Sequence, residues 1–117
     1  MRLWRDLENT HKKSIEYGKK AVEYESKCEN IEDDIRTYVK KELSTITGEN
    51  CNKTIWSLEE YITRVNMSIS DDVIRVEFIN SFYMEYWVMK KISELFPEFM
   101  LSIHSVEGHL MLVMKSR

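Results

Sequence analysis

The chain has 117 residues, of which 43% are hydrophobic and 32% are charged, and its formal net charge is −3. This length suits one domain with a single modest core, and the composition excludes an intrinsically disordered chain. The slightly acidic balance argues against a dedicated nucleic-acid-binding domain, which is usually basic. We therefore expect a single domain that spans residues 1–117.

The first residues and the cysteines indicate where the protein works. Residues 1–13, MRLWRDLENTHKK, mix charged and apolar side chains and lack the apolar run of a signal peptide. No stretch approaches the ~18 consecutive apolar residues of a membrane span. Cys28 and Cys51 do not have the spacing of a metal or redox motif. We expect a cytoplasmic protein with free thiols, no membrane anchor and no cofactor.

Residues 3–46 lack proline and place apolar side chains at near-helical spacing, which predicts α-helix. Asn30 can cap a new helix, and the acidic residues at 32–34 would then lie in its first turn, where the helix dipole favours them. We expect two helices over about 3–28 and 31–46. One long helix is the alternative.

From about residue 60 the apolar pattern changes to a period of two, which predicts β-strands. A two-residue turn at Asp71-Asp72 would pair Val65 with Phe78 and place the apolar side chains of both strands on one face. A turn at Glu107-Gly108 does the same for residues 99–115. Its inner face would hold Phe99, Leu101, Ile103, Leu110, Leu112 and Met114.

These elements predict an α+β fold in which a helical segment, residues 1–48, precedes a hairpin–helix–hairpin segment, residues 60–117. Two hairpins around one helix give the order ββαββ and a four-stranded antiparallel sheet with helices packed on one face.

The helix between the hairpins is expected over residues 81–96, with Asn80 or Ser81 as its cap and Pro97 at its end. One half of its circumference is apolar and would face the sheet. Glu85 projects into this apolar half, where loss of water would raise its pKa.

The other half of this helix carries three aromatic rings. Either the N-terminal helices cover the rings as a third layer, or the rings form a surface that binds a partner. The predicted partner-binding residues are Tyr83, Tyr86, Trp87 and Lys90 on the helix and Met111 on the exposed face of the sheet.

Two other kinds of function have weaker sequence signals. Lys12, Lys13, Lys19 and Lys20 cluster on the first helix, where they could contact nucleic-acid phosphates. His104 and His109 fall on one face of the second hairpin and are the candidates for a metal site in a metal-dependent enzyme.

The chain lacks an ordered catalytic motif and a glycine-rich phosphate loop, so we expect a protein that is not an enzyme. The leading hypothesis is a small adaptor, inhibitor or accessory regulator that binds protein and forms a homodimer. A single alanine among eleven isoleucines favours an A/T-rich genome, such as a low-GC bacterium, its phage or a mobile element.

Overall fold

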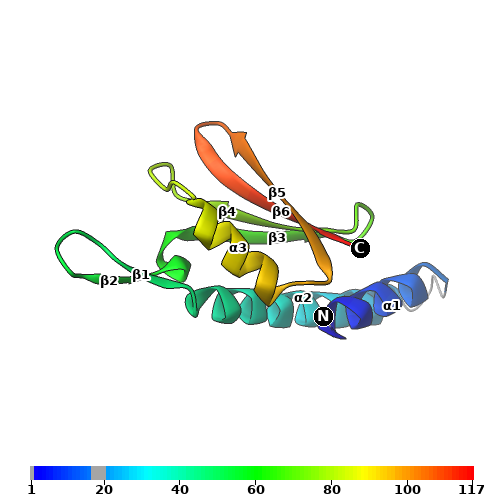
Figure 1. Cartoon of the computed structure of the whole chain (residues 1–117). Coiled ribbons are helices and arrows are strands. Elements are labelled where there is room, and N and C mark those ends of the chain that lie inside the picture. Colours follow the sequence, from blue (N-terminus) through cyan, green and yellow to red (C-terminus); the bar gives the residue numbers. More distant parts are fainter. Residues whose placement is uncertain (1, 17–20) are drawn as a thin grey trace.

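The computed structural model describes residues 2–16 and 21–117 and shows an α+β fold that measures 57 × 24 × 23 Å (Figure 1). The helices are α1 (Arg2–Glu16), α2 (Ala21–Ser44) and α3 (Tyr86–Leu95), with a 3-10 turn, η2 (Leu58–Tyr61). The strands are β1 (Thr47–Glu49), β2 (Ile55–Ser57), β3 (Ile62–Ser68), β4 (Val73–Phe78), β5 (Phe99–Val106) and β6 (His109–Ser116).

The main sheet is antiparallel with the strand order β3-β4-β6-β5, so β4 and β6 join the two hairpins at its centre. One face of the sheet packs against the helices, and together they bury the core. This core includes Ile35 and Val39 of α2, Ile92 of α3, and Val76 and Leu112 of the central strands. The predicted fold class and four-stranded antiparallel sheet are therefore confirmed.

The second hairpin has the predicted register. Val106 pairs with His109, and His104 pairs with Met111, around a turn at Glu107-Gly108. Both turn residues have positive φ, 49° and 84°, as a two-residue turn with the twist of a β-hairpin requires. Glycine adopts this conformation without strain, which explains why the turn lies where Gly108 is.

The first hairpin differs from its prediction. Val65 pairs with Val76 and not with Phe78, because the connection is a four-residue loop, 69–72, in which Asp72 has a φ of 61°. Between Val65 and Phe78 this shift of two residues keeps the side chains on their predicted faces, since side chains along a strand alternate with a period of two. A bulge between Ile62 and Arg64 interrupts the alternation, so that Ile62 pairs with Phe78 and packs against the core.

The N-terminal region has the two predicted helices, but their bounds differ from the prediction. Helix α2 continues through Asn30, so the predicted break near 28–31 is wrong, and so is the alternative of one long helix, since α1 and α2 are two helices that lie side by side (Figure 1). The acidic residues after Asn30 are accommodated inside the helix because Glu32 and Asp33 pair with Arg36, at 3.7 and 2.9 Å. Gly18, which falls within the predicted first helix, lies outside the described residues.

Helix α1 docks on the sheet through buried Trp4 and Leu7, and the Trp4 ring meets Phe99 at a centroid distance of 6.1 Å. Its Glu8 lies near the loop that holds Asp72. Burial, followed by the neighbouring Asp72 carboxylate, raises the pKa of Glu8 above its ordinary value of 4.5.

Helix α3 is shorter than predicted, beginning at Tyr86 with Glu85 as its N-cap. The preceding residues stay in a loop because the Phe82 ring stacks on Phe78, at 4.7 Å. Glu85 is exposed, so its predicted place in the apolar half of the helix is wrong. Its carboxylate accepts a hydrogen bond of 2.6 Å from the indole N–H of Trp87.

Candidate partner-binding surface

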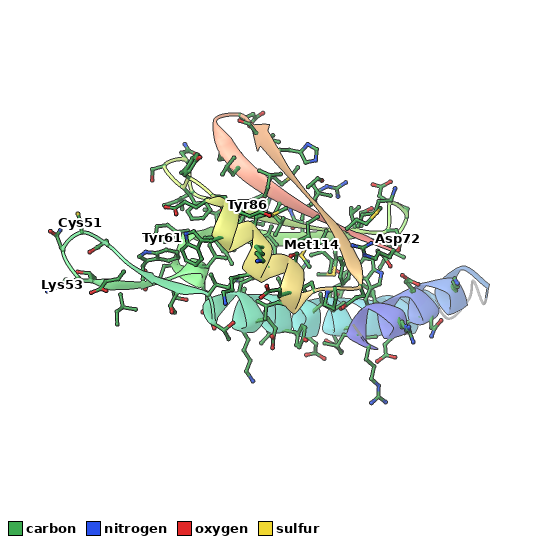
Figure 2. All side chains as sticks on the ribbon, viewed as in Figure 1. Cys51, Lys53, Tyr61, Asp72, Tyr86 and Met114 are labelled. Atoms are coloured by element: carbon green, nitrogen blue, oxygen red, sulfur yellow. The ribbon has the colours of Figure 1, made fainter. Side chains whose placement is uncertain are left out.

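A short ribbon of β1 and β2, which was not among the predicted elements, extends from the end of α2 (Figure 1). Its turn is organised by Asn50, whose side-chain oxygen accepts hydrogen bonds from the N–H groups of Asn52 and Thr54, each at 3.0 Å. Side-chain bonds of this kind are how asparagine stabilises turns. Figure 2 shows Cys51 and Lys53 at the tip of the ribbon, away from the core.

The base of the ribbon holds Trp56 in place. Gly48 and Trp56 are cross-strand partners, and the indole of Trp56 lies directly on Gly48. A Cβ atom at Gly48 would lie 2.5 Å from Cε2 and 2.8 Å from Nε1 of Trp56, well inside contact distance. Glycine at this position therefore lets the indole lie flat across the ribbon.

From Trp56 a chain of ring contacts runs to α3 in one direction and into the core in the other. Trp56 lies 5.9 Å from Trp87 and 5.8 Å from Tyr61, and Tyr61 lies 5.1 Å from Phe82. Phe82 in turn stacks on the buried Phe78. Ring pairs at these separations each contribute about 0.5–1.5 kcal/mol beyond the burial of their area.

We call the outer members of this group, with Tyr83 beside them, the aromatic surface. It consists of Trp56, Tyr61, Phe82, Tyr83 and Trp87. Tyr83 and Tyr86 are 79% and 83% exposed, and Trp87 is also exposed. The interpretation in which the N-terminal helices cover the rings of the α3 region is therefore wrong.

Two hollows border the aromatic surface. The larger, about 380 Å³, has Ile46 and Leu95 among its apolar residues, Trp87 on one side and Lys91 and Glu94 among its polar residues. The smaller, about 190 Å³, lies among Trp56, Tyr61, Phe82 and Tyr83. Because Trp87 borders the first, Trp56 borders the second and their rings touch, the indole pair separates the two hollows.

The remaining predicted partner-binding residues are divided between different surfaces. Lys90 is exposed on α3 but faces a third hollow, about 280 Å³, that it shares with Tyr86 and with Leu101 of β5. Met111 is half-buried on the outer face of the sheet, where it pairs with His104 and Glu77. The structure therefore does not bring Met111 together with the rings on α3.

The two histidines lie on the outer face of the second hairpin, as predicted, but have different neighbours. His104 shares a hydrogen bond of 3.0 Å with the Ser102 hydroxyl, and Nε2 of His109 lies 3.6 Å from the Glu77 carboxylate. In the described part of the chain, no three His, Cys, Asp or Glu side chains are arranged to hold a metal ion.

Of the lysines proposed to contact nucleic acid, only Lys12 has a described side chain, and it is exposed on α1. Lys13 lies on α1 with its side chain outside the description, and Lys19 and Lys20 are outside the described residues.

Trp56, Tyr61 and Phe82 were missed by the sequence interpretation. Asn50 and Gly48 are turn and close-contact residues, and their spacing before Trp56 was a usable signal for a ribbon. The chain has no match among protein-family models, curated proteins or solved structures. Among residues 2–16 and 21–117, no helix combines the length and apolar character needed to cross a membrane.

Proposed function

We propose that the protein is a non-enzymatic interaction module that binds a protein partner through the aromatic surface. The observation that supports this most is the exposure of Tyr83, which is about four-fifths open to solvent and borders the smaller of the two hollows that flank the Trp56–Trp87 pair. Exposed rings gathered at one place are uncommon on a surface without a binding role.

The two indoles of the aromatic surface are held in place before any partner arrives. Trp87 is held by its hydrogen bond to Glu85 and by its contact with Trp56, which is itself held against Gly48. A side chain that is already ordered loses less conformational entropy on binding, so its contacts contribute more to affinity. Tryptophan and tyrosine are also the residues most often found at the energetic centre of protein interfaces.

The larger hollow indicates what the partner presents. Its apolar residues, Ile46, Leu95 and Trp87, suit one apolar anchor side chain, while Lys91 and Glu94 can pair with polar groups around that anchor. The partner in this proposal is a protein segment with an exposed aromatic or aliphatic side chain. The protein would act on it as an adaptor, inhibitor or accessory regulator, in the cytoplasm and as a homodimer, with a phage or mobile element as its source.

Selection of displayed random peptides on the immobilised protein tests the proposal. We expect the recovered peptides to share an apolar anchor and to bind Trp87→Ala at least about tenfold more weakly, equal to a loss of ~1.4 kcal/mol. Met100→Ala is the matched control, since it also removes an exposed apolar side chain but from the opposite face of the sheet. Its affinity for the same peptides should not change.

Circular dichroism of both variants verifies that the fold is retained. The proposal is wrong if no peptide is enriched, or if the enriched peptides bind Trp87→Ala and the unmodified protein equally well.

The alternatives, a nucleic-acid-associated regulator and a metal-dependent enzyme, stay predictions. The two arginines of the first hairpin do not favour nucleic-acid binding, because both are paired with carboxylates. The Arg64 guanidinium lies 3.7 Å from the Glu77 carboxylate, and the Arg75 guanidinium lies 3.6 Å from the Asp71 carboxylate. A basic side chain that is paired in this way has less free charge for a phosphate.

A further inference from the structure

The two edges of the main sheet are built differently. At the β3 edge, the pairing is interrupted by a bulge between Ile62 and Arg64. The Nε–H of Arg36, from α2, donates a hydrogen bond of 2.9 Å to the Val65 carbonyl on this edge. Bulges, charged side chains and covering groups are the usual devices that prevent an edge strand from pairing with another chain.

Among the described residues, none of these devices is found along residues 100–106 of the β5 edge; at the start of the strand the N–H of Phe99 donates to the Phe96 carbonyl at 3.1 Å. The eight residues of β5, FMLSIHSV, contain no proline and no Lys, Arg, Asp or Glu, and they pair with β6 without a register shift. Among the described residues, no strand pairs with its outer side. Figure 1 shows β5 and β6 rising away from α1 and α2 toward their turn, so the later part of β5 lies clear of those helices.

The hydrogen-bond pattern shows which backbone groups this edge presents. The N–H of Arg117 donates to the Glu98 carbonyl at 3.1 Å, so the hydrogen-bonded pairs of the β5–β6 ladder involve the even-numbered residues of β5. The N–H and C=O groups of the odd-numbered residues Leu101, Ile103 and Ser105 therefore point outward, toward the open edge.

The side chains along this edge are also incompletely covered. Leu101 and Ile103 are on the core face but are only half-buried, whereas Leu112 and Met114, their partners on β6, are fully buried. The third hollow, about 280 Å³, lies between Leu101 and the Tyr86 and Lys90 side of α3. An additional strand at this edge would cover apolar surface as well as pair backbone groups.

The polarity pattern of β5 indicates that the additional strand is β5 of a second copy of this chain. Residues 100–106, MLSIHSV, have nearly the same polarity pattern in both directions about Ile103. An antiparallel pair centred there would place Met100 opposite Val106 and Ser102 opposite His104 of the other copy. Ile103 would meet its own equivalent on the core face, and no two lysines, arginines or acidic residues would face each other.

We propose that two copies of this chain pair through the edges of β5, antiparallel and centred on Ile103, to form a continuous eight-stranded sheet. This inference rests on the homodimer named in the proposed function and does not depend on the aromatic surface. The contacts would be backbone hydrogen bonds with matched side chains, which is the usual mode of β-strand addition.

Light scattering coupled to gel filtration tests the pairing on the full chain, at concentrations from about 1 μM to about 1 mM, the range expected of weak to moderate dimers. We expect a concentration-dependent rise to twice the 14.1 kDa of one chain. Ser105→Pro should prevent it, because the lost N–H points outward and is not used by β6. Ser105→Ala keeps that N–H and should dimerise normally.

A second measurement does not depend on the proline variant folding. In a chain carrying Cys28→Ser and Cys51→Ser, Ser102→Cys in one copy and His104→Cys in the other should form a disulfide when the two proteins are mixed. Such a pair without mutual hydrogen bonds has a Cα separation of ~4.5 Å, within the range that a disulfide spans. Either single variant alone should cross-link much less.

A monomer throughout the concentration range overturns this inference, and so does a dimer that gives no mixed disulfide. These outcomes are separable from those of the peptide selection. Ser105→Pro should still bind the selected peptides, and Trp87→Ala should still dimerise. Loss of the dimer in Trp87→Ala with retention in Ser105→Pro would assign the dimer to the aromatic surface and refute the β5 interface.

Discussion

The contact between Gly48 and Trp56 makes one substitution especially informative. In Gly48→Ala the new methyl group would overlap Cζ2 of the indole and lie 2.5 Å from Cε2, so the ring must move by more than about 1 Å to regain an optimal separation of about 3.5 Å. Trp56 also contacts Trp87 and Tyr61, so the movement would disturb both of these ring pairs.

Two opposing free energies decide the size of the effect. Inserting a methyl group into a packed contact costs about 1–3 kcal/mol. Replacing glycine by alanine inside a strand recovers about 0.5–1 kcal/mol, because the unfolded chain then has less conformational freedom to lose. We expect the free energy of unfolding of Gly48→Ala to fall by roughly 1–2 kcal/mol, together with weaker peptide binding at the aromatic surface.

Urea denaturation measures the free energy of unfolding, and near-ultraviolet circular dichroism reports the packing of the Trp56–Trp87 pair. Glu49→Ala is the matched control, because Glu49 is the exposed next residue of β1 and its loss should change stability by less than about 0.5 kcal/mol. If Gly48→Ala were as stable as the unmodified protein and kept its near-ultraviolet spectrum, the indole could not lie on Gly48.

Other substitutions test the core, α3 and the docking of α1. Ile92→Ala, at a fully buried position of α3, should lower the free energy of unfolding by about 2–5 kcal/mol in urea denaturation. Tyr86→Ala, at an exposed position of the same helix, should change it by less than about 0.5 kcal/mol. The raised pKa of Glu8 stabilises the folded state below pH 4.5, and this contribution is lost as the pH rises through the raised value. Glu8→Gln should therefore increase stability more at about pH 7 than at about pH 4, and an equal change at both values would contradict the assignment.

The sheet could be predicted from the sequence because its signals were local. The second hairpin was predicted in its exact register, since Gly108 supplies the positive φ of the turn and the apolar pattern allows one pairing. The first hairpin has no glycine, and its loop of four residues could not be told from a turn of two by polarity alone. Only a shift of the β3–β4 pairing by an odd number of residues would have moved the paired side chains to the other face of the sheet.

The errors in the helices came from contacts that sequence periodicity does not contain. The 81–85 segment has helical spacing of apolar residues, but Phe82 is engaged by Phe78 and Tyr61, so the helix starts at Tyr86. The rings on α3 were predicted on the half of the helix that faces away from the sheet, and whether the N-terminal helices would cover them could not be decided from the sequence. Their neighbour Trp56 was not predicted, because it reaches α3 through the ribbon, which lies far from α3 in sequence.

The two proposed surfaces together have a consequence that neither has alone. Pairing centred on Ile103 places the equivalent residue of each copy on the same face, so the two-fold axis is perpendicular to the sheet and both α3 helices lie on one side of it. Both aromatic surfaces would then face the same way, and a surface coated densely with a selected peptide could engage both copies at once. Linked binding of this kind raises apparent affinity by about 10²–10⁴-fold without new contacts. Ser105→Pro should lose that gain on a coated surface while binding the free peptide with unchanged affinity. A gain that persists in Ser105→Pro, or that never appears in the unmodified protein, would contradict this arrangement.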